Sequence, residues 1–125
     1  MTKIQNLGEY KGNHLFVKRE DLIPFSFGGN KARKAQLFFR EIDMGDYDCV
    51  VTYGSSSSNH SRVVANECCK RGMPVYIISP EEASEPTFNS QMMEIFGAEI
   101  TTVPVSKVHD TIEAKLTELK AAGKK

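Results

Sequence analysis

The fold is decided by one stretch, CVVTYGSSSSNHSRVVANECCKRGMPVYII, at residues 49–78. Its first five residues form an apolar, β-branched run, which is typical of a buried strand. A turn rich in serine follows, and residues 59–71 then predict a helix that ends before Gly72. The apolar run at residues 75–78 predicts a second strand. A strand, a helix and a strand of these lengths indicate a right-handed βαβ unit with parallel strands.

The same alternation continues toward the C-terminus. Pro86 is a favoured first residue of a helix, and residues 86–96 carry an apolar stripe that we expect in the core: Phe88, Met92, Ile95 and Phe96. Residues 100–103 predict a third strand. A last helix, capped by Ser106 and ended by Gly123, has an apolar face made of Val108, Ile112, Leu116 and Leu119. We therefore predict an α/β fold, a three-layer α/β/α arrangement around a short parallel sheet.

The N-terminal part is expected to be a strand-loop-helix lead-in. Residues 1–13 are polar with two glycines, which suggests a loop or a weakly held arm. Residues 14–18 can form a short strand. Residues 31–44 predict a helix that Gly45 ends, and the residues available for burial on it are Ala35, Leu37, Phe38 and Ile42. We divide the chain into the lead-in with this helix, 1–45, and a small α/β domain, 46–125.

Composition excludes several classes of function. The chain has 125 residues, of which 40% are hydrophobic, so it can bury one ordinary core. Lys plus Arg and Asp plus Glu are both 16, and this balance does not favour nucleic acid or an anionic membrane as a partner. No apolar run approaches the ~20 residues of a membrane span, and the N-terminus does not resemble a signal peptide. Three cysteines, an odd number without metal-ligand spacing, indicate a reducing compartment and no metal site. We expect a cytoplasmic protein.

A basic helix start is the first candidate functional motif. Gly28 and Gly29 permit a tight turn, and Asn30 is a suitable N-cap for the helix that follows. The first helical turn then carries Lys31 and two further cations. Each cation at a helix N-terminus costs roughly 0.3–1 kcal/mol, because the helix dipole favours anions there. Either this is a surface helix that happens to be basic, or an amine is needed at this position for binding or covalent chemistry.

The serine loop, residues 54–58, is the second candidate motif. It joins a strand end to a helix start, where backbone amides and serine hydroxyls can bind an anion. It has neither the Gly-Lys-Ser/Thr of a phosphate loop nor a dinucleotide fingerprint. The alternative is a structural turn in which Ser58 or Asn59 caps the helix. A hydrolase built on Ser58 and His60 is a weaker hypothesis, because no nucleophile elbow accompanies them.

Three motifs in order resemble one family. They are Lys18-Arg19-Glu20-Asp21-Leu22, Phe27-Gly28-Gly29-Asn30-Lys31-Ala32-Arg33-Lys34 and Ser57-Ser58-Asn59-His60-Ser61-Arg62. Together they resemble the pyridoxal-phosphate enzymes of the tryptophan synthase β fold (fold type II). Within that family they are most similar to the D-cysteine desulfhydrase and 1-aminocyclopropane-1-carboxylate (ACC) deaminase group. The resemblance runs from about Leu15 to the end of the chain.

The resemblance implies roles for individual residues. Lys31 would form the Schiff base with pyridoxal phosphate and later move protons, and Arg33 and Lys34 are neighbouring cations of the kind that favour a free amine. Asn59 would hydrogen-bond the 3-hydroxyl of the cofactor. Ser58 would also take part in proton chemistry. The residues implied in binding the substrate carboxylate and the rest of a small amino acid are Ser57, Ser58, Asn59 and His60.

The resemblance also implies that a portion is missing. Family chains are much longer, and their cofactor-phosphate loop comes later, so this chain looks like an N-terminal part with little or no turnover of its own. An uncovered sheet edge and lead-in then predict a homo-oligomer, for example with exchanged N-terminal arms. His60 favours the desulfhydrase side, whereas the loop sequence leaves the substrate open. Two alternatives remain: a non-catalytic α/β domain that binds a small anion at the loop Ser55–His60, and one half of a split enzyme.

Overall fold

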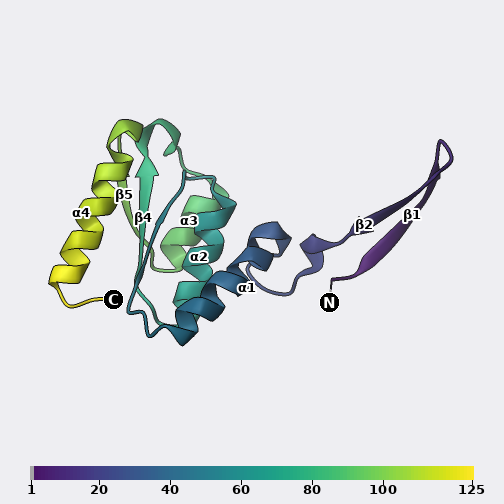
Figure 1. Cartoon of the computed structure of the whole chain (residues 1–125). Coiled ribbons are helices and arrows are strands. Elements are labelled where there is room, and N and C mark those ends of the chain that lie inside the picture. The colour runs from purple at the N-terminus through teal and green to yellow at the C-terminus, as the bar shows by residue number, and fades with distance from the viewer. Residues whose placement is uncertain (1) are drawn as a thin grey trace.

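A computed structural model describes residues 2–125. Its N-terminal part is an antiparallel hairpin of β1 (Ile4–Tyr10) and β2 (Asn13–Lys18), which projects away from the rest of the chain (Figure 1). The prediction of a loop for residues 1–13 was therefore wrong for the described residues. The two glycines shape the hairpin instead of interrupting it. Gly8 lies at a shift in the strand register, and Gly12 has a left-handed backbone (φ 75°) in the turn.

The predicted parallel sheet is present. It consists of β3 (Val50–Tyr53), β4 (Val75–Pro80) and β5 (Glu99–Val103), in the order β3-β4-β5. Two helices connect these strands, α2 (Asn59–Lys70) and α3 (Phe88–Ile95), and α4 (Val108–Ala121) follows the last strand. Figure 1 shows α2 and α3 on one face of the sheet and α4 on the other. The α/β fold in three layers is confirmed.

Helix α1 (Gly29–Met44) packs against α2 on the outside of this arrangement. Its buried residues are Ala32, Ala35 and Phe39, which follow one another at intervals of three and four residues and so lie on one face. Ala35 was predicted correctly for burial. Leu37 and Phe38 were not, since 66% and 46% of their surfaces are exposed. The side chains that complete the core include Val63, Cys68, Ile77 and Met93.

The starts of the last two helices differ from the prediction. Helix α3 begins at Phe88, and a reciprocal capping box between Thr87 and Ser90 fixes that start. Pro86 therefore precedes the helix. Phe88 and Ile95 are exposed (63% and 73%), so these two residues of the predicted stripe do not face the core, whereas Phe96 packs against it as predicted.

Ser106 is not the cap of α4. It lies inside a short 3-10 turn, Val105–Lys107, that runs into the helix. Val108 and Leu119 are buried as predicted. The helix returns across the sheet toward β3, and the backbone of Lys125 meets Asp48 there. The Asp48 amide donates to the Lys125 carbonyl oxygen at 2.9 Å.

Candidate functional site

The serine loop closes tightly between β3 and α2. Ser58 is the N-cap of α2, and its Oγ accepts a hydrogen bond from the Ser61 amide at 3.1 Å. Ser61 Oγ in turn donates to the Tyr53 carbonyl oxygen at 3.2 Å. A Cβ atom on Gly54 would lie 2.7 Å from Ser58 Oγ, so only glycine fits under this cap. The predicted capping by Ser58 is present.

The loop before Lys31, here called the lysine loop (residues 25–29), has an unusual backbone. Ser26, Phe27, Gly28 and Gly29 all have positive φ, from 49° to 88°. Helix α1 starts at Gly29 with Gly28 in the N-cap position, so Asn30 is not the cap that was predicted. A Cβ atom on Gly28 would lie 2.7 Å from the Asp21 carbonyl oxygen. This turn places Lys31 in the first turn of α1.

Helix α2 holds the lysine loop in place. Arg62 Nη1 donates to the Ser26 carbonyl oxygen at 2.7 Å, and its guanidinium lies over the Phe27 ring at 5.1 Å. The Ser26 hydroxyl contacts Asn66 Oδ1 (2.6 Å) and Glu67 Oε1 (3.1 Å). Left-handed backbone is costly for serine and phenylalanine, and it persists where surrounding contacts enforce it. Contacts from α2 therefore set the path of the chain into α1.

Glu67 extends this attachment to the other end of α1. Burial would raise the pKa of Glu67, but hydrogen bonds from Arg71, Lys70 and Ser26 together lower it, so the carboxylate is held ionised. Arg71 also donates to both carboxylate oxygens of Asp43, at 2.7 and 2.9 Å. Helix α1 is thus tied to α2 near both of its ends.

A small cavity of about 180 Å³ opens between the starts of α1 and α2. Lys31 and Asn59 both line it, although 28 positions separate them in the sequence. The rest of the lining is the lysine loop with its neighbours, namely Phe27, Gly28, Gly29, Asn30 and Arg62. A residue with an amine and a residue with an amide therefore line one cavity, each from the first turn of a helix.

The other predicted site residues lie outside this lining. The Ser57 hydroxyl is exposed, 3.2 Å from Ser55 Oγ. The His60 ring contacts β3 and α1, with Nε2 3.4 Å from Thr52 Oγ1 and an edge contact to Phe38. Across residues 2–125 no hydrogen bond joins Ser58 to His60, which gives the hydrolase hypothesis no support. The roles predicted for Ser57, Ser58 and His60 in substrate binding stay predictions.

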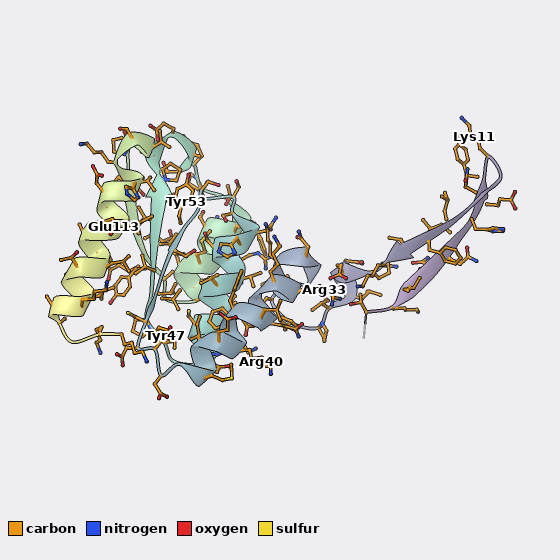
Figure 2. The ribbon with its side chains drawn as sticks, viewed as in Figure 1. Lys11, Arg33, Arg40, Tyr47, Tyr53 and Glu113 are labelled. Atoms are coloured by element: carbon orange, nitrogen blue, oxygen red, sulfur yellow. The ribbon has the colours of Figure 1, made fainter. Side chains whose placement is uncertain are left out.

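Arg33, which was expected as a cation acting on Lys31, is paired with a carboxylate. Its Nε donates to Glu20 Oε2 at 2.6 Å, and Nη2 contacts Thr2 Oγ1. Figure 2 shows Arg33 on the side of α1 that faces the hairpin. This ion pair lowers the pKa of Glu20 and joins the lead-in to the helix that carries Lys31. Arg33 therefore serves to attach the lead-in.

His60 makes folding sensitive to mild acid. Burial lowers the pKa of His60, and the charges of Lys31 and Lys34 lower it further. A histidine with a lowered pKa in the folded state takes up its proton more readily when the chain is unfolded. The free energy of unfolding should therefore fall as the pH drops below the ordinary histidine value of about 6.5. Urea denaturation at pH 7.5 and 5.5 measures this loss, which should be smaller in His60→Gln. An equal loss in both chains would contradict the assignment.

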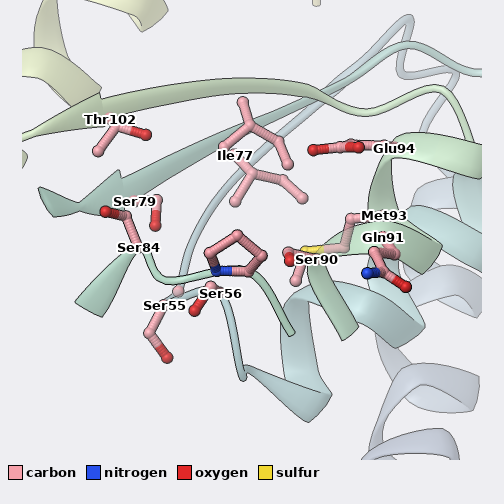
Figure 3. A pocket seen from close by; sticks show the side chains of 13 residues that line it. Ser55, Ser56, Ile77, Ser79, Ser84, Ser90, Gln91, Met93, Glu94 and Thr102 are labelled. Carbon is pink, nitrogen blue, oxygen red and sulfur yellow. The ribbon is translucent and has the colours of Figure 1, made fainter. Parts of the chain in front are cut away.

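A larger cavity of about 470 Å³ adjoins the serine loop on the side of α3 (Figure 3). Ser55 and Ser56 line it together with Ser79, Ser90 and Thr102, above an apolar floor that includes Ile77 and Met93. Its described lining contains the carboxylate Glu94 and no lysine or arginine. Hydroxyls next to a carboxylate do not favour an anion. The hypothesis of an anion-binding domain at the serine loop thus gains little from this cavity.

Comparison with known proteins shows the family. The pyridoxal-phosphate dependent enzyme family matches residues 1–125, and the chain belongs to it. Its similarity extends to a D-cysteine desulfhydrase of Yersinia enterocolitica, with 28% identity over 116 residues, 88% of this chain and 34% of that protein. An ACC deaminase of Mesorhizobium japonicum is 32% identical over 135 residues, 98% of this chain and 40% of that protein.

The structural comparison agrees. The solved structure of an ACC deaminase homologue superposes with a TM-score of 0.81 at 28% identity, over 99% of this chain and 40% of that one. The predicted resemblance to the desulfhydrase and deaminase group is therefore confirmed, and so is pyridoxal phosphate as the cofactor of the family. The chain spans about a third to two fifths of the length of these relatives.

The residues around the small cavity fit one edge of pyridoxal phosphate. The amine of Lys31 can react with its aldehyde, and the amide of Asn59 can donate to the oxygen beside it on the ring. Small-molecule pockets usually measure roughly 300–1,000 Å³, and this cavity of about 180 Å³ is smaller. The described residues therefore suit the reactive edge of the cofactor and not the whole molecule.

Proposed function

We propose that this chain supplies the lysine-bearing part of a pyridoxal-phosphate dependent lyase or deaminase that acts on a small amino acid, such as D-cysteine or ACC. The observation that carries the proposal is the shared cavity of Lys31 and Asn59. Membership of the family and similarity to both a desulfhydrase and a deaminase support it. The predicted preference for D-cysteine rests on His60 and is the finer part of the proposal.

Each residue has a task that its surroundings permit. Bound pyridoxal phosphate supplies an electron sink for the bond to be broken. Lys31 would hold the cofactor through its Nζ, and its amine would move protons at the substrate. Asn59 would donate a hydrogen bond to the ring oxygen. Ser58 Oγ already accepts from the Ser61 amide, so its hydroxyl proton stays available to the substrate carboxylate, with Ser57 beside it.

The remainder of the site is proposed to come from a further C-terminal portion, on the same polypeptide or on a second one. The small cavity supports this, because it lacks room for the cofactor phosphate. The division into the lead-in with the lysine-bearing helix, 1–45, and the small α/β domain, 46–125, belongs to the same proposal. Turnover that appears only when a separately made C-terminal portion is added would identify the split form.

The proposal is tested by titrating the chain with pyridoxal phosphate while visible absorbance is recorded. Borohydride reduction followed by peptide mapping then locates the modified lysine. A saturable band with the label on Lys31 is the expected result. Slow labelling spread over surface lysines would refute a formed cavity in this chain.

The cellular location proposed is the cytoplasm. The cysteines Cys49, Cys68 and Cys69 are all free, which suits a reducing compartment. None of the helices found in residues 2–125 is long and apolar enough to cross a membrane.

Self-association is expected from the hairpin. Ile4, Leu7, Tyr10 and Phe16 each expose more than half of their surface, and an isolated two-stranded hairpin is marginally stable in water. We predict a homo-oligomer with exchanged hairpins, visible by light scattering. The double variant Leu7→Lys, Phe16→Lys should be monomeric, whereas Leu37→Lys on α1 should not change the mass. A monodisperse wild-type monomer would disprove the exchange.

A further inference from the structure

Asn89 connects α3 to Asn59, which lines the small cavity. It is the second residue of α3, and its Nδ2 lies 2.8 Å from the Ser57 carbonyl oxygen. The same nitrogen lies 3.1 Å from Asn59 Oδ1. Asn89 lies outside all three motifs of the resemblance.

These two contacts determine the orientation of both amides. A backbone carbonyl oxygen only accepts hydrogen bonds, so the group of Asn89 that faces Ser57 must be its NH₂. Because that NH₂ also faces Asn59, the end of the Asn59 amide directed to Asn89 must be the acceptor oxygen. The NH₂ of Asn59 is then turned away from Asn89. It is left as a donor at the cavity that Asn59 lines.

The start of α3 is itself fixed against both loops of the site. Thr87 Oγ1 donates to the Ser56 carbonyl oxygen at 2.6 Å, and the Phe88 ring packs edge-on against Phe27 at 6.0 Å. The capping box between Thr87 and Ser90 holds the first turn of the helix. Asn89 is therefore held at a defined place relative to the serine loop and the lysine loop.

We propose that Asn89 is a positioning residue, which orients the Asn59 amide so that the cavity receives a hydrogen-bond donor and not an acceptor. The ligand group that this selects is an anionic or acceptor oxygen. Given the proposed function, on which this inference rests, that group is the ring oxygen next to the aldehyde of pyridoxal phosphate. The orientation of Asn59 is a property of this chain and exists without ligand.

The decisive variant is Asn89→Asp, which keeps the shape of the side chain but only accepts hydrogen bonds. An aspartate in the first turn of a helix is favourable, so α3 should not be weakened. Asn59 should turn its NH₂ toward the new carboxylate and present Oδ1 to the cavity. The concentration of pyridoxal phosphate needed for half saturation should rise about tenfold.

Added charge alone is controlled by Gln91→Glu, which places a carboxylate on an exposed residue of the same helix that lines the larger cavity and not the small one. It should leave half saturation within about twofold of wild type. The neutral variant Asn89→Ala should also weaken the binding of pyridoxal phosphate, as Asn89→Asp does. In both Asn89 variants the pH midpoint of the adduct's absorbance should rise, because a lost donor no longer stabilises the ring-oxygen anion.

Nuclear magnetic resonance of the ligand-free chain gives a second readout that does not depend on the cofactor. The side-chain amide protons of Asn59 should show Overhauser contacts to the cavity lining, at Phe27 or Lys31. Contacts to Ser57 in the wild-type chain would overturn the proposal. The proposal would also be overturned if Asn89→Asp, with Lys31 labelled, kept the wild-type concentration for half saturation and the wild-type pH midpoint. If Lys31 of the wild-type chain is not labelled, the proposed function is refuted. The orientation of the Asn59 amide is then decided by the Overhauser contacts alone.

Discussion

Lys31→Ala is expected to abolish the saturable absorbance band that pyridoxal phosphate gives with the wild-type chain. The amine that reacts is removed, and no other lysine lines the small cavity among the residues that the structure describes. The loss should be complete, because a covalent bond cannot form without the nucleophile. Absorbance titration measures it, and reduced, digested samples show whether the label has moved elsewhere.

Lys34→Ala is the matched control for this change. Lys34 lies one turn from Lys31 on the same helix, is exposed, and does not line the cavity. The control should keep the band. An undiminished band in Lys31→Ala, or an equal loss in Lys34→Ala, would show that the reactive lysine lies elsewhere.

The second large effect is expected from Arg62→Met. Arg62 is only 6% exposed, and removing it deletes a charge-assisted hydrogen bond to the lysine loop together with its contact with Phe27. A buried hydrogen bond to a charged group contributes roughly 1.5–3 kcal/mol, and a contact between a cation and an aromatic ring adds about 0.5–1 kcal/mol. Arg62 Nε is buried without a hydrogen-bond partner in the described chain, and the cost of burying it offsets part of the stabilisation by Arg62. The free energy of unfolding should fall by about 2 kcal/mol.

Urea denaturation followed by circular dichroism checks this value. Arg40→Met, on the exposed side of α1, should change the free energy of unfolding by less than about 0.5 kcal/mol. Arg62→Lys should not restore stability, because an ammonium lacks the planar group that reaches the Ser26 carbonyl while covering a ring. Equal denaturation midpoints for Arg62→Met and wild type would contradict the role of Arg62.

The layers of the fold could be predicted from local periodicity. The β-branched runs at β3, β4 and β5 are short and bounded by turns, and each is followed by a segment of helical length. The second strand of the hairpin was predicted at residues 14–18. The first strand could not be predicted, because residues 4–10 bury nothing in this chain and so have no alternation of apolar and polar residues. The prediction that Phe88 and Ile95 face the core was wrong for a related reason. Periodicity identifies an apolar face but not what covers it.

The site was predictable in its chemical groups and not in its supports. Lys31 stood out because a cation begins a predicted helix, whereas Asn59 was singled out by the family resemblance, and the structure places both on one cavity. Arg62 ends one of the three motifs but had no role assigned to it, and Asn89 gave no signal, since a single arginine or asparagine in a helix is ordinarily a surface residue. Their importance comes from the left-handed backbone of Ser26 and the acceptor oxygens of Ser57 and Asn59. These appear only in three dimensions.

The order of the strands bears on how such a site forms during synthesis. Each strand of the sheet pairs with the next one along the chain, so no strand pairing has to wait for a segment beyond the next strand. The contacts that hold Lys31 and Asn59 come from residues up to α3. Because domains fold from the N-terminus as they are made, the wall of the cavity that carries the lysine can be complete before any later segment is translated.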